Sequence, residues 1–125
     1  MSKPFGDLIY TPERATGEAV SKVETHTPKI TAPDKVKAGE EFQVTITVGP
    51  HPNTVQHSIR KIKVYFAEEG RPFNPIHIAT VELEPEYAEP KVTLTVKLKK
   101  SGTIYAVGYC NLHGLWEARK EITVE

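Results

Sequence analysis

Hydrophobic and polar residues alternate along most of the chain after residue 29. The clearest stretch, residues 42–48, reads Phe-Gln-Val-Thr-Ile-Thr-Val, and the same period of two recurs in residues 62–66, 92–98 and 104–110. Alternation rich in β-branched residues is typical of strands that bury one face in a core. Shorter strands fit residues 29–37, 76–83 and 118–124.

Turn-forming residues separate these segments, as at Ala38-Gly39-Glu40 and Ser101-Gly102. Seven short strands joined by turns predict an all-β protein, a seven-stranded immunoglobulin-like antiparallel β-sandwich. Alternation places one set of apolar side chains between the two sheets. The predicted core is Phe42, Val44, Ile46, Ile62, Val64, Phe66, Val92, Leu94, Val96, Ile104 and Ala106.

The first 22 residues lack this alternation. Within them Thr11-Pro12-Glu13 is a helix-start signal, so the N-terminal extension, residues 1–22, is expected to contain one short helix. Residues 23–125 are expected to form the β-sandwich domain, which makes a chain of 125 residues a single domain overall.

Composition excludes several classes of function. Sixteen Lys and Arg balance sixteen Asp and Glu, and a chain without net positive charge is a poor nucleic-acid binder. The apolar residues are too scattered for a membrane span, and the N-terminus lacks an apolar run of signal-peptide length. We therefore expect a soluble cytoplasmic protein with no nucleic-acid and no membrane partner.

The candidate chemistry lies between the predicted strands. His51 and His57 occupy a connection that contains two prolines, Cys110 and His113 follow the end of a strand, and His26 comes just before the first strand. Connections held by rigid strands are where such folds usually carry function. Four imidazoles and one thiol gathered there are candidate metal ligands.

The number and kind of these ligands narrow the choice of metal. Structural zinc takes four ligands, and calcium and magnesium prefer oxygen. A blue-copper site uses two His, one Cys and a weak axial Met, but the only methionine is Met1, so a copper electron-transfer protein is the second choice. Five nitrogen and sulfur ligands suit iron with a sixth position open. A metal-free immunoglobulin-like interaction module is the other alternative, in which the five side chains would be independent of each other.

Two motifs make the reading more specific. Residues 51–59 read HPNTVQHSI and residues 110–116 read CNLHGLW, and together they resemble the one-iron superoxide reductases, the neelaredoxins, from about residue 18 to the C-terminus. The resemblance implies a homotetramer that reduces superoxide by one electron to hydrogen peroxide, with rubredoxin or a similar small protein as the electron donor. It also implies one mononuclear iron (Fe) per chain, with equatorial ligands His26, His51, His57 and His113 and the axial ligand Cys110.

The segment before the first strand departs from the family pattern. The resemblance implies that Glu24 is a sixth ligand to the resting ferric iron. The family reads Glu-Lys-His-x-Pro there, whereas this chain has Thr25 in place of the lysine, whose role in the family is to attract superoxide and help protonate the product. Lys22, four residues before His26, is our candidate for that role, the alternative being an ordinary solvated lysine.

Overall fold

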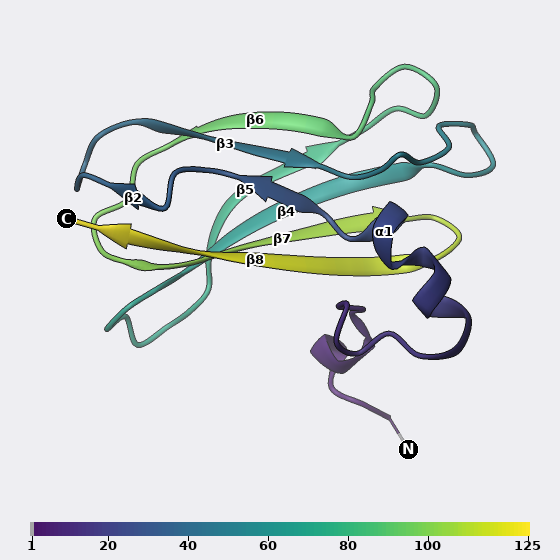
Figure 1. The fold of residues 1–125 in the computed structure, drawn as a ribbon, viewed down its shortest axis with the longest axis horizontal. Coiled ribbons are helices and arrows are strands. Elements are labelled where there is room, and N and C mark those ends of the chain that lie inside the picture. Colours follow the sequence, from purple (N-terminus) through teal and green to yellow (C-terminus); the bar gives the residue numbers. More distant parts are fainter. Residues whose placement is uncertain (1) are drawn as a thin grey trace.

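Two β-sheets face each other in the computed structural model, which describes residues 2–125 (Figure 1). One sheet has three strands in the order β1-β3-β6, and the other has five in the order β2-β8-β7-β4-β5. All neighbouring strands are antiparallel except β2 and β8. The strands are β1 (Lys29–Thr31), β2 (Lys35–Val36), β3 (Phe42–Thr47), β4 (Ile59–Glu68), β5 (Ile76–Glu82), β6 (Lys91–Val96), β7 (Gly102–Cys110) and β8 (Gly114–Val124).

The structure has eight strands where the sequence predicted seven, because the predicted strand 29–37 is divided. Its first part, β1, pairs with β3, and its second part, β2, pairs with β8 in the other sheet. Pro33 lies at the break, and a proline has no N–H to continue a ladder of hydrogen bonds. The chain therefore crosses between the sheets at this point.

The core lies between the sheets, as the alternation predicted. Val44 and Ile46 of β3 are fully buried opposite the inward side chains of β4 and β7, such as Ile62 and Ala106. Three predicted core residues, Phe42, Val92 and Leu94, are only partly buried and pack at the margin of this cluster. Buried hydrophobic residues that the prediction did not include are Val48, Ile59, Leu83, Leu98, Cys110, Trp116 and Ile122.

The segment before the strands has little regular structure. It contains two 3₁₀ helices, η1 (Phe5–Leu8) and η2 (Gly17–Lys22), and one turn of α-helix, α1 (Val23–His26). The extension is thus helical in part, as expected, but not at the predicted start signal: the N–H of Arg14 donates to the Thr11 hydroxyl at 3.2 Å, which closes only a turn. Tyr10, just before it, is held extended against β8 by hydrogen bonds to Leu115 and Glu117. Among the residues described, no helix has the length and apolar character needed to cross a bilayer.

Strand pairing brings the candidate ligands to one end of the molecule. Ile59 at the start of β4 pairs with Cys110 at the end of β7, and Cys110 pairs with Gly114 at the start of β8. The connection that carries His51 and His57 therefore meets the β7–β8 turn. Figure 1 shows α1 beside that turn, so His26 arrives at the same end.

Candidate metal centre

The four candidate imidazoles form a closed square. Neighbouring ring centroids are 4.6 Å apart for His26–His51 and His51–His57, 5.0 Å for His57–His113 and 4.9 Å for His26–His113. The diagonal from His26 to His57 is 6.3 Å. Each ring stands nearly perpendicular to its neighbours, at 73° to 82°. Side chains from three separate segments of the chain therefore point at one position.

The ring nitrogens are spaced as ligands of one ion would be. His26 Nε2 lies 3.1 Å from His51 Nε2 and 3.1 Å from His113 Nδ1. Two nitrogens bound at right angles to an ion at about 2.1 Å would lie about 3.0 Å apart. A neutral imidazole nitrogen either donates or accepts, so one nitrogen does not satisfy two such neighbours by hydrogen bonds alone.

The single cysteine completes the group. Cys110 is fully buried, and its Sγ accepts a hydrogen bond from the His113 backbone N–H at 3.4 Å and lies 3.7 Å from His113 Nδ1. The ligand atoms of His26, His51, His57 and Cys110 all lie within 4.8 Å of one another. Three imidazole nitrogens and one sulfur thus share one small volume, and the fourth nitrogen, His113 Nδ1, is in contact with His26 Nε2 and Cys110 Sγ.

An unpaired ring nitrogen of His57 shows that these residues fit a metal ion. Within residues 2–125, His57 Nε2 is buried and has no hydrogen-bond partner. Nearly all buried polar atoms in folded proteins are paired, so an unpaired nitrogen inside a cluster of ligand-type groups needs an explanation. A bound cation would supply the missing partner, and the mixed nitrogen and sulfur donors suit a transition metal.

Hydrogen bonds behind the rings fix two of the imidazoles. His26 Nδ1 lies 3.2 Å from the carbonyl oxygen of Lys22 and 2.8 Å from the Thr25 hydroxyl, and His51 Nδ1 lies 2.7 Å from the carbonyl oxygen of Pro52. A carbonyl accepts only, so each Nδ1 carries the proton and each Nε2 is left as a free lone pair. An imidazole that binds a metal through Nε2 needs that tautomer.

Burial favours the neutral form of the same rings. It lowers the pKa of His26 to about 4, with further lowering by the neighbouring His51 and His113. Burial also lowers the pKa values of His51 and His57. Neutral imidazole is the form that binds a metal, so no proton has to leave these rings near neutral pH.

Two stacked aromatic residues, Trp116 and Tyr10, pack against the β7–β8 turn. Trp116 is buried, its indole N–H donates to the carbonyl oxygen of His113 at 3.0 Å, and its ring centroid lies 5.4 Å from that of His26. Tyr10 stacks on Trp116 with centroids 4.8 Å apart. Trp116 is the last residue of the CNLHGLW motif, whereas Tyr10 stands outside both motifs and was not predicted; only the fold brings it to the turn.

The three other predicted site residues lie on η2 and α1. Glu24 is exposed on α1, and Thr25 turns its hydroxyl to the back of His26. Lys22 is half-buried and lines a pocket of about 370 Å³ together with Leu112, His113 and Trp116. Lys22 is also one of the positive charges that lower the pKa of His57, after burial and the neighbouring imidazoles.

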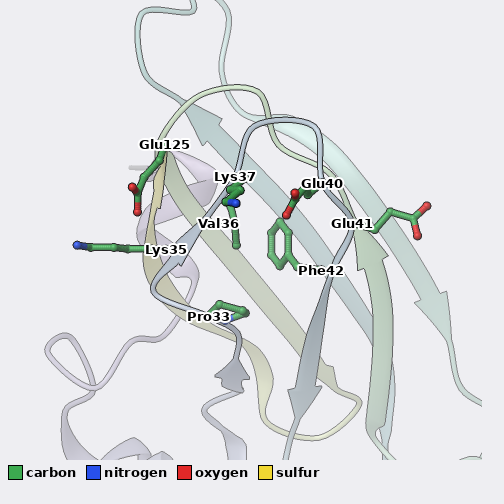
Figure 2. A pocket seen from close by; sticks show the side chains of 8 residues that line it. All are labelled: Pro33, Lys35, Val36, Lys37, Glu40, Glu41, Phe42 and Glu125. Carbon is green, nitrogen blue, oxygen red and sulfur yellow. The ribbon is translucent and has the colours of Figure 1, made fainter.

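A second hollow, of about 390 Å³, lies at the opposite end of the sandwich (Figure 2). None of its eight lining residues is a His or a Cys, so it is not a metal site of the same kind. The ring of Phe42 stands among charged side chains there (Figure 2). The lining residues are Pro33, Lys35, Val36, Lys37, Glu40, Glu41, Phe42 and Glu125.

Comparison with known proteins identifies the family. Residues 18–119 match the family model described as desulfoferrodoxin. The chain belongs to the desulfoferrodoxin family. The superoxide reductase of Pyrococcus furiosus is 39% identical over 119 residues, which cover 83% of this chain and 91% of that protein. The neelaredoxin of Megalodesulfovibrio gigas is 35% identical over 119 residues, with coverage of 83% and 91%.

Solved structures of the family agree with this fold. The superoxide reductase (neelaredoxin) of Ignicoccus hospitalis superposes with a TM-score of 0.93 at 70% identity, covering 98% of this chain and 100% of that one. The fold of a desulfoferrodoxin-family protein thus extends over nearly the whole chain, including the segment that carries α1.

Proposed function

We propose that the chain is a superoxide reductase, which reduces superoxide by one electron to hydrogen peroxide at a mononuclear iron. The observation that carries the proposal is the convergence of four imidazoles and one thiol around a buried, unpartnered His57 Nε2, in a chain of the desulfoferrodoxin family. Relatives named superoxide reductase match the chain over most of their length, which supports the activity.

Iron would be held by the five residues of this centre. When bound, it supplies the single electron that superoxide takes and regains it from an external donor. Neither alternative is favoured. A metal-free module would leave His57 Nε2 buried and unpaired, and residues 2–125, which form the centre described here, contain no methionine to serve as the weak axial ligand of a blue-copper site. The proposed ligand atoms are Nε2 of His26, His51 and His57, Nδ1 of His113, and Sγ of Cys110.

The protein's own groups set the charge of the centre. Burial favours the neutral form of three of the four imidazoles, and the one ligand that would bind a metal as an anion is Cys110, as a thiolate. With one negative and four neutral ligands, these residues would leave a bound divalent cation with a net positive charge, which would attract the superoxide anion. The hydrogen bond from the His113 N–H to Sγ withdraws charge from the sulfur and would so tune how strongly it donates to a bound metal.

Glu24 is proposed to bind the oxidised centre. Its exposed carboxylate sits on α1, two residues before His26, and would lower the positive charge of the ferric state when the product has left. Glu24→Gln should change the visible spectrum of the oxidised protein and leave the rate of the first reaction with superoxide unchanged. An unaltered spectrum would remove Glu24 from the ligand set.

Lys22 is proposed to take over the attraction that the family assigns to a lysine at position 25. Its position beside His113 and its electrostatic effect on His57 support this role. Lys22→Ala should lower the bimolecular rate with superoxide and flatten its dependence on ionic strength. Lys35→Ala, at the opposite end of the sandwich, is the matched control. Equal rates and equal salt slopes for the two variants would show that Lys22 is an ordinary solvated lysine.

The chain is proposed to form a homotetramer, as its family resemblance implies. Sedimentation of the iron-loaded protein tests the tetramer.

The electron is proposed to come from rubredoxin or a similar small electron carrier. We propose that this carrier docks on the rim of the ligand loops. Leu112 and Val55 support this location, because they are apolar, more than half exposed, and carried by the two ligand segments. Chemical-shift mapping that placed rubredoxin on another face would contradict the docking site.

The decisive test is a single turnover. The protein is loaded with iron, reduced, and mixed with superoxide from pulse radiolysis. One ferric centre and one hydrogen peroxide should appear for each superoxide consumed, and Cys110→Ser should abolish the thiolate absorption of the oxidised centre. Release of dioxygen together with peroxide, without net oxidation of the iron, would mean dismutation instead.

A further inference from the structure

Asn111 joins the two ligand-bearing segments of the centre. Its side-chain Oδ1 accepts a hydrogen bond from the Ser58 N–H at 2.9 Å, and its Nδ2 donates to the carbonyl oxygen of Gln56 at 2.9 Å. Its backbone N–H also donates to the Ser58 carbonyl oxygen at 3.3 Å. The Asn111 side chain is therefore hydrogen-bonded to Gln56 and Ser58, the residues on either side of His57. Asn111 itself directly follows Cys110 in the chain.

His57 depends on such support more than the other imidazoles do. His26 and His51 each have Nδ1 fixed by a carbonyl oxygen. The hydrogen bonds found for His57 in the described chain are those of its backbone with Thr54, and its Nε2 has no partner. The direction of the His57 ring therefore follows from where its backbone is held.

Arg60 supports the same connection in a different way. Its guanidinium donates to the Ser58 hydroxyl at 2.6 Å and to the Val55 carbonyl oxygen at 2.5 Å. These bonds tie the 51–57 connection to the start of its own strand. They do not reach the β7–β8 turn, so Asn111 is the side chain that links the two ligand segments to each other.

We infer that Asn111 is a positioning residue that sets His57 relative to Cys110 and His113 before a metal binds. The inference rests on the proposed metal centre. Preorganised ligands lose less conformational freedom on binding, and removing groups that orient metal ligands typically costs about 10- to 100-fold in metal affinity. Asn111 acts through the backbone on either side of His57 and does not touch the metal position itself.

A purely structural role is the competing explanation, and the chain offers a matched control for it. Asn74, in the β4–β5 connection, accepts from the Glu68 N–H at 3.0 Å and donates to the carbonyl oxygens of Glu68 at 3.0 Å and Arg71 at 3.1 Å. This is the same kind of asparagine bridge in a turn without ligands. Asn111→Ala and Asn74→Ala should therefore both lower the stability of the metal-free protein.

The test measures ferrous iron affinity by competition with a chelator under anaerobic conditions, and urea unfolding of the metal-free proteins in parallel. Asn111→Ala should weaken iron binding about 10- to 100-fold, and Asn74→Ala should leave it at the wild-type value. In a His57→Ala background, Asn111→Ala should have little further effect, because the group it positions is gone. Asn111→Ser replaces the alanine variant if that one does not fold.

The outcomes separate this inference from the proposed function. A wild-type protein that binds no iron would overturn the proposed centre itself. Wild-type iron binding with equal affinity in the Asn111 and Asn74 variants would overturn the positioning role alone. A full loss of affinity from Asn111→Ala even in the His57→Ala background would show that Asn111 does not act through His57.

Discussion

Replacing Trp116 by phenylalanine tests whether the residue under the β7–β8 turn supports the metal centre or only fills the core. Trp116 is 1% exposed, and its indole N–H donates to the carbonyl oxygen of His113, a proposed ligand, at 3.0 Å. Its ring also contacts His26 and Tyr10. A change at this one position therefore reaches two ligands from different segments.

The expected loss of stability follows from these contacts. Leaving the His113 carbonyl without its donor costs about 1–3 kcal/mol. Losing roughly 40 Å² of buried aromatic surface adds about 1 kcal/mol. Trp116→Phe should therefore lower the free energy of unfolding of the metal-free protein by about 2–4 kcal/mol. Iron affinity should fall as well, because His113 loses the contact that orients its backbone.

The assay needs a control that costs stability without touching the ligands. Ile122 is buried near the far end of the same strand, β8, and Ile122→Val should cost about 0.5–1.5 kcal/mol. Urea unfolding of the metal-free proteins measures stability, and chelator competition measures iron affinity. Ile122→Val should leave iron affinity at the wild-type value. The reasoning is refuted if Trp116→Phe destabilises the fold but also leaves iron affinity at the wild-type value.

Three further predictions concern the ligands and one glycine. His26 has a pKa near 4 in the fold and an ordinary pKa of 6.5 when unfolded, so acid protonates the unfolded chain first. The metal-free protein should lose on the order of 2 kcal/mol of stability in urea melts between about pH 7.5 and about pH 5, and His26→Gln should reduce that loss. His57→Leu removes a buried unpaired nitrogen, so it should preserve stability in the same melts while weakening iron binding more than about tenfold in chelator competition. A Cβ on Gly102 would collide with the backbone carbonyl oxygen of Ala67, so Gly102→Ala should lower the melting temperature strongly, without changing the iron affinity of the folded fraction.

The strands could be predicted because each follows the alternation of its own residues. Residues 42–48 alternate strictly, and the structure places β3 there with Val44 and Ile46 buried. The division of residues 29–37 could not be read in this way, because both parts are extended and only pairing with different sheets separates them. Pro33 was the available signal, since proline interrupts a ladder.

The site was predictable as a set of residues but not as an arrangement. His51, His57, Cys110 and His113 stand in two compact motifs, and His26 was a candidate because it precedes the first predicted strand. Two sets of contacts could not be predicted, because each joins residues more than 50 positions apart. Asn111 is hydrogen-bonded to the residues on either side of His57, and Tyr10 stacks on Trp116. Such contacts depend on the register of β4, β7 and β8, which sequence periodicity does not specify.

The structure shows what Thr25, which replaces the lysine of the family pattern, does at this position. The Thr25 hydroxyl can donate to the Lys22 carbonyl oxygen, at 3.3 Å, and accept from His26 Nδ1, at 2.8 Å. A residue that carries a positive charge in the family pattern therefore serves here to orient a proposed ligand. The same contact holds Lys22 next to the centre. Because α1 is a single turn, too short to be stable alone, its place depends on these bonds and on the contact of His26 with Trp116. The Thr25 hydroxyl therefore contacts both His26, a proposed ligand, and the backbone of Lys22, the residue proposed to supply positive charge.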